Sequence, residues 1–140
     1  MSQFFGFVGI IFVGVLTLCS ALKWPAAGRM LIVAWLVRTT VLLSGYFFIA
    51  LPDGGGDALT FERVGYNWSR EGLIAAIGYF PGPDSYFISW LFAVIYAVIG
   101  RSMLMAQSIS LFFGMGAVLM IFLLARKMWG TAVAVRAGWV

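Results

Sequence analysis

The chain has 140 residues, of which 63% are hydrophobic and 10% are charged. A soluble domain carries about 45–50% apolar and about 25% charged residues, so this composition excludes a water-soluble globular protein and predicts an integral membrane protein. Nine Lys and Arg residues against five acids give a net charge of +4. In a membrane chain such an excess indicates cytoplasmic anchoring, and we expect no nucleic-acid partner.

Two long apolar runs come first, at about 4–22 and 30–51. Each is long enough to cross roughly 30 Å of hydrocarbon as a helix. The second run contains a charge, Arg38, which lies roughly 12 Å along the helix from Met30. We keep two interpretations of Arg38. Its side chain either reaches the membrane surface or pairs within the bundle, or it is a functional cation that faces a polar cavity and binds substrate.

The segment 52–84 holds every acidic residue of the chain: Asp53, Asp57, Glu62, Glu71 and Asp84. A carboxylate in hydrocarbon costs several kilocalories, so this segment must lie in water or at the membrane surface. Any acid–base chemistry of the protein is therefore expected in this loop.

An amphipathic helix is predicted to begin at Asp57, after the glycines at 54–56 interrupt the preceding helix. At 100° per residue, one side of this helix is apolar and the other carries polar residues. The apolar side consists of Phe61, Val64, Gly65 and Trp68, and the polar side of Glu62, Arg63, Tyr66, Asn67 and Arg70. This pattern predicts a helix lying flat on the bilayer, with Glu62 solvated on its polar face.

Two further apolar runs follow, at about 85–99 and 103–125, separated by a turn at 100–102. The predicted fold is therefore all-α: a single membrane domain over 1–140 with about four transmembrane helices. An amphipathic interfacial helix is expected in the loop between the second and third of these helices.

The basic residues do not agree on one orientation for four crossings. Lys23 and Arg29 place the first turn in the cytoplasm and therefore loop 52–84 on the non-cytoplasmic side. Arg126 and Lys127 then fall outside, against the positive-inside rule. We predict an integral protein of the bacterial inner membrane with loop 52–84 non-cytoplasmic.

Asp57 is the candidate catalytic residue of this loop. It opens the amphipathic helix in line with Phe61, so its carboxylate is expected to point toward the membrane. The alternative is that Asp57 only caps the helix, a role that Asp often takes.

Arg63 and Arg70 are seven residues apart and share a face with Asn67 between them, which suits a phosphate or pyrophosphate group. The alternative is that they bind anionic lipid headgroups. Asp84 is a further candidate for substrate binding, or a turn residue.

Metal and nucleotide chemistry are not expected. The chain has no histidine and a single cysteine, Cys19, so no metal-ligand spacing exists. The glycines at 54–56 lack the lysine of a phosphate-binding loop, and we expect no cofactor.

Several motifs recur in a defined order along the chain: Gly56-Asp57-Ala58-x-x-Phe61, Trp68-x-x-x-Gly72, Pro83-x-x-Tyr86, Tyr96-x-x-x-Gly100 and Leu123-Leu124-Ala125-Arg126-Lys127-x-x-Gly130. This order resembles the N-terminal part of the GT-C superfamily of polytopic glycosyltransferases, the protein O-mannosyltransferase and aminoarabinose transferase-like group. The family's enzymes have more spans and a large C-terminal part. The resemblance therefore implies a fragment, a truncated product or a small relative that works with other membrane subunits.

The resemblance implies transfer of a sugar from a polyprenyl-phosphate donor, with Asp57 as catalytic base or acceptor-positioning residue. Asp84 would match a second loop acid of some members. The alternative is a non-catalytic small membrane subunit whose acidic loop binds a partner or lipid headgroups.

Overall fold

The computed structural model describes residues 2–48 and 56–139, and within these ranges all regular secondary structure is helical. Three helices are long and apolar enough to cross a membrane: α1 (Ser2–Lys23), α2 (Pro25–Phe47) and α6 (Met103–Trp129). The shorter helices are α3 (Gly56–Ser69), α4 (Leu73–Gly78), α5 (Phe87–Ile99) and α7 (Thr131–Ala137). The predictions of an all-α fold and of a membrane protein are thus confirmed.

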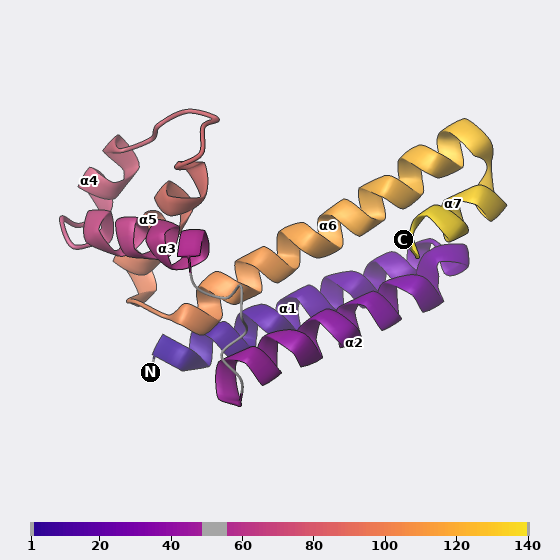
Figure 1. Ribbon diagram of the computed structural model, residues 1–140, viewed down its shortest axis with the longest axis horizontal. Coiled ribbons are helices and arrows are strands. Elements are labelled where there is room, and N and C mark those ends of the chain that lie inside the picture. Colours follow the sequence, from indigo (N-terminus) through magenta and orange to yellow (C-terminus); the bar gives the residue numbers. More distant parts are fainter. Residues whose placement is uncertain (1, 49–55, 140) are drawn as a thin grey trace.

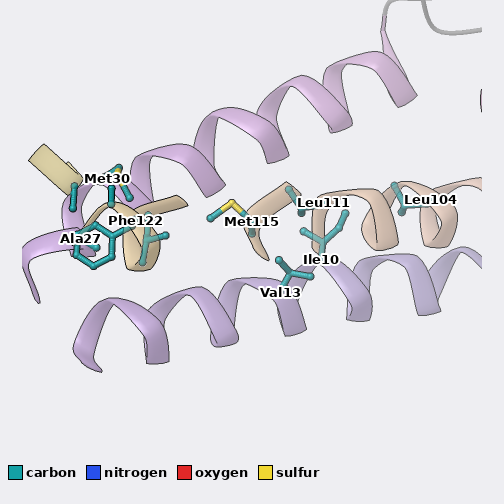
Figure 2. Packing of buried hydrophobic residues seen from close by; sticks show 11 residues of the cluster. Ile10, Val13, Ala27, Met30, Leu104, Leu111, Met115 and Phe122 are labelled. Carbon is teal, nitrogen blue, oxygen red and sulfur yellow. The ribbon is translucent and has the colours of Figure 1, made fainter. Parts of the chain in front are cut away.

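The long helices α1, α2 and α6 form a bundle in which α2 runs antiparallel to the other two (Figure 1). Small residues let them approach closely, because a Cβ atom added to Gly6 would lie 2.6 Å from the Cβ of Leu104. A Cβ on Gly14 of α1 would lie 2.7 Å from the Trp35 ring of α2. Figure 2 shows the apolar interior, where Ile10 lies beside Leu111.

The short helices α3, α4 and α5 form a second unit at the end of the bundle where α1 and α6 begin and α2 ends (Figure 1). In this unit α3 packs closely along α5. A Cβ on Gly65 would lie 2.6 Å from the carbonyl oxygen of Ser89. Gly100, with φ of +84°, ends α5 in the left-handed region, and Ser102 caps α6 by accepting from the Met105 N–H at 3.2 Å.

The predicted crossing at 85–99 corresponds to α5, a helix of 13 residues. At 1.5 Å per residue α5 extends only about 20 Å, less than the hydrocarbon thickness of roughly 30 Å. It is not among the helices long enough to span, so a fourth crossing is not confirmed.

The apolar side of α3 packs partly against α5. Gly65 is buried against α5, and Phe61 and Trp68 are half-buried beside Tyr86. Helix packing within the protein thus uses part of the apolar surface that was predicted to face lipid. A flat interfacial placement of α3 is not confirmed.

Charges are distributed unequally between the two ends of the bundle. The α1–α2 turn, the end of α6 and the helix α7 lie together at one end (Figure 1). Five basic residues belong to these segments: Lys23, Arg29, Arg126, Lys127 and Arg136. The described acids all belong to α3 and to the loops on either side of α4, at the opposite end.

Candidate functional site

A pocket of about 590 Å³ lies where the end of α2 and the start of α6 meet α3 and α5. Its volume is within the range of about 300–1,000 Å³ typical of small-ligand sites. Most of its wall is apolar, and the polar side chains that line it are Tyr46, Glu62, Gln107 and Ser110. Such a lining suits an amphipathic ligand with a few hydrogen-bonding groups.

Glu62 is the charged residue of this wall and is almost completely buried, at 2% exposure. It forms a two-pronged ion pair with Arg101, whose Nε and Nη2 donate to its Oε1 and Oε2 at 2.9 and 2.8 Å. The Arg101 guanidinium also lies 4.5 Å from the ring centroid of Tyr66. Planar, two-pronged pairing is the strongest geometry for an arginine and a carboxylate.

The hydrogen bonds from Arg101 hold the pKa of the Glu62 carboxyl below its ordinary value, although burial acts in the opposite direction. Glu62 is therefore anionic at neutral pH and fully engaged by its partner. A carboxylate in this state is a poor proton acceptor, so the ion pair is suited to fixing α3 in place.

Gln107 provides the pocket with an available acceptor. Its Oε1 atom is buried and accepts no hydrogen bond from the described residues. A buried acceptor without a donor is costly, and a ligand hydroxyl or amide would satisfy it.

The predicted catalytic residue Asp57 lies in the first turn of α3, one position before Ala58, which lines the pocket. Its side chain is outside the described part of the structure, as is the whole of Asp53. Because Asp57 is the neighbour of Ala58 in the chain, its backbone lies at the edge of the pocket.

Arg63 and Asn67 are exposed residues of α3. Arg70, the residue just after α3, is also exposed. Arg63 also lies near enough to Glu62 to help lower the pKa of that carboxyl. A shared phosphate-binding face of these residues stays a prediction.

Arg38 and Asp84 do not line the pocket. The Nη1 atom of Arg38 lies over Gly114 of α6, only 2.8 Å from where a Cβ would stand. Asp84 accepts a hydrogen bond from the Tyr86 N–H at 2.7 Å and so shapes the turn before α5. This hydrogen bond supports the interpretation of Asp84 as a turn residue.

Sequence reasoning missed the Glu62–Arg101 pair and wrongly placed Glu62 in solvent. Two signals pointed to it. On the helical wheel Glu62 is the polar residue next to Gly65, at the border of the apolar side, and Arg101 is the lone charge between two apolar runs.

Among the residues described, no group of three or more His, Cys, Asp and Glu side chains is arranged to hold a metal ion. No protein-family model matches the chain, and comparisons with curated proteins and with solved structures gave no match.

Proposed function

We propose that this chain transfers a sugar from a polyprenyl-phosphate donor, either as a small glycosyltransferase-like protein or as the N-terminal piece of a larger one. The observation that carries the proposal is the pocket beside the start of α3, which joins an apolar wall to the acceptor groups of Gln107, Ser110 and Tyr46. A lipid-linked sugar has the same two-part character, because an isoprenoid chain adjoins a group rich in hydroxyls.

In the proposed reaction the Asp57 carboxylate takes the proton from an acceptor hydroxyl. The hydroxyl oxygen attacks the anomeric carbon of the donor, and the bond from that carbon to the phosphate oxygen breaks. The departing polyprenyl phosphate carries the electron pair and is stabilised by Arg63 and Arg70, or by Arg38 if the lipid enters along the bundle. Glu62 is excluded as the base by its ion pair with Arg101.

We place the α3–α5 unit on the non-cytoplasmic side of a bacterial inner membrane, with three crossings by α1, α2 and α6. Three crossings bring Lys23, Arg29, Arg126 and Lys127 to one face, in agreement with the positive-inside rule. A fourth crossing by α5 would separate these residues onto opposite faces.

A catalytic role of Asp57 is tested by Asp57→Asn in membranes supplied with a polyprenyl-phosphate sugar. Sugar transfer should be lost while the protein still inserts. The matched control is Glu71→Gln, because Glu71 is exposed and accepts a hydrogen bond from the Tyr79 hydroxyl at 2.5 Å, away from the pocket lining. Normal transfer by Asp57→Asn would exclude it as the base.

The phosphate role is tested by the double variant Arg63→Ala with Arg70→Ala, which should weaken polyprenyl-phosphate binding. Lys127→Ala, at the opposite end of the bundle, is the control. Unchanged affinity of the double variant would favour the alternative role in anchoring to anionic lipids.

The alternative function is a non-catalytic membrane subunit. Among the described residues, Glu62 is the carboxylate that lines the pocket, and it is engaged in a structural ion pair. This observation favours a non-catalytic role. Full activity of a partner complex containing Asp57→Asn would support this function.

A further inference from the structure

Helix α4 and the loop residue Phe80 expose large apolar side chains, although α4 packs against α5. Of its six residues only Ala76 is buried, and the large side chains around it point outward. We define the α4 patch as Leu73, Ile74, Ile77 and Phe80, which are 41%, 89%, 51% and 55% exposed. We propose that the α4 patch inserts into the bilayer crossed by the bundle, at the boundary between headgroups and acyl chains.

The chemistry of this segment fits hydrocarbon. No charged residue occurs from Gly72 to Pro83, whereas α3 exposes Arg63, and Arg70 follows directly after its end. Lipid excludes charge, so α4 and not α3 has the composition of an inserted surface.

Backbone N–H groups from Ala76 to Phe80 are bonded within the segment itself. The N–H groups of Ala76, Tyr79 and Phe80 donate to the carbonyls of Gly72, Ala75 and Ile77 at 2.9, 3.1 and 3.3 Å. Internally bonded backbone groups can enter an apolar phase without losing hydrogen bonds.

Aromatic rings border the patch on the side of α3 and α5. Trp68 stacks on Tyr79 with ring centroids 5.4 Å apart, and Phe80 meets Trp90 edge-on at 4.9 Å. Trp and Tyr concentrate at the water–lipid boundary because each ring has an apolar body and a polar atom.

The bilayer is the occupant because the chain itself holds the patch near it. The α3–α5 unit is attached at the end of membrane-spanning helices and lies beside that end (Figure 1). At that end those helices expose apolar side chains of the same kind, such as Phe4 at 67% and Phe47 at 56%. The α4 patch extends the lipid-facing surface of the protein, and this inference does not depend on the proposed enzyme activity.

The test places a nitroxide spin label at Ile74→Cys in a Cys19→Ser background, with the full chain in phospholipid vesicles. Asn67→Cys, on the exposed side of α3, is the matched control, and Ile77→Cys is a second patch site. Collision rates are measured with oxygen, which concentrates in lipid, and with a water-soluble nickel complex. The ratio of oxygen to nickel collisions should be several-fold higher at both patch sites than at Asn67.

Three results would overturn the inference. A ratio at Ile74 equal to that at Asn67 would place the patch in water. Protection of Ile74 from both reagents would indicate that another protein covers it. Spin–spin broadening between labels would show that a second copy of the chain occupies the patch.

Discussion

The bundle of α1, α2 and α6 and the unit of α3, α4 and α5 are both helical, but different contacts hold their helices together. In the bundle, glycines at 6, 9 and 14 of α1 remove side-chain volume at the crossings, and no ion pair joins the described residues of the three helices. The α3–α5 unit is held by the ion pair of Glu62 with Arg101 and by the stacked rings of Trp68 and Tyr79. Where lipid surrounds a helix, close packing is the available attraction, whereas a unit at the membrane edge can also use charge.

The largest effect is expected from Arg101→Ala, because it removes both hydrogen bonds from arginine to the buried Glu62 carboxylate. Since the Arg101 side chain is itself 48% exposed, we expect a loss of about 2–3 kcal/mol in the free energy of unfolding, measured by denaturation in detergent micelles. Arg70→Ala removes an exposed arginine and should change stability by less than about 0.5 kcal/mol. Equal effects of the two substitutions would show that the ion pair does not hold α3.

The next effect is expected at the α3–α5 crossing. Gly65→Ala places a Cβ 2.6 Å from a backbone oxygen and 2.8 Å from the Cβ of Phe92, so the helices must separate. We expect a loss of about 1–3 kcal/mol by the same measurement. Gly78→Ala, in α4, meets nothing within 4 Å and should be neutral or stabilising by up to about 1 kcal/mol. A neutral Gly65→Ala would mean that the crossing is looser than described.

A smaller loss, about 1–2 kcal/mol, is expected from Gly6→Ala in the bundle, because α1 and α6 can shift slightly in lipid. The added methyl would lie 2.6 Å from the Cβ of Leu104. Gly116→Ala in α6 is the control, since its Cβ would meet nothing within 4 Å. Comparing the two by unfolding in micelles isolates the effect of close packing. Identical stabilities would show that α1 and α6 do not depend on the small residue.

The smallest effect is expected from lowering the pH below the ordinary carboxyl pKa of 4.5. The pKa of Glu62 in the folded state is below its ordinary value of 4.5, so its ionised form stabilises the fold at neutral pH. This stability is complete above the ordinary value and is lost as the pH falls through the lower folded pKa. The free energy of unfolding, measured at decreasing pH, should show this loss of stability in the wild type but not in Glu62→Gln. A parallel loss in both would assign it to other acids.

The positions of the long helices followed closely from the sequence. Runs at 4–22, 30–51 and 103–125 correspond to α1, α2 and α6, because a stretch of about 20 mostly apolar residues has few alternatives to a helix. Helix α2 begins earlier than predicted, at Pro25, and positions 49–51 of the predicted run lie outside the described residues. The start of α3 near Asp57 was also predictable, since the preceding glycines favour interruption of the helix.

The candidate site was predicted less completely. Position in the sequence indicated the loop and the exposure of Arg63 and Arg70. It did not identify Gln107, which lies on a different helix and lines the pocket only because α6 begins beside α3. Nor did it show that Arg38 lies over Gly114, since that contact depends on which helices are neighbours.

By itself the sequence determined the three long apolar helices, and it predicts that the acids stay out of hydrocarbon, because hydrocarbon rejects charge whatever its partners. Tertiary structure alone decided which side of α3 is buried and that Glu62 pairs with Arg101, 39 positions away. The physical reason is that an amphipathic helix can satisfy its apolar side with lipid or with another helix, and periodicity does not distinguish them. The close contact of Gly65 with α5 shows that this part of the apolar side packs against a helix of the protein.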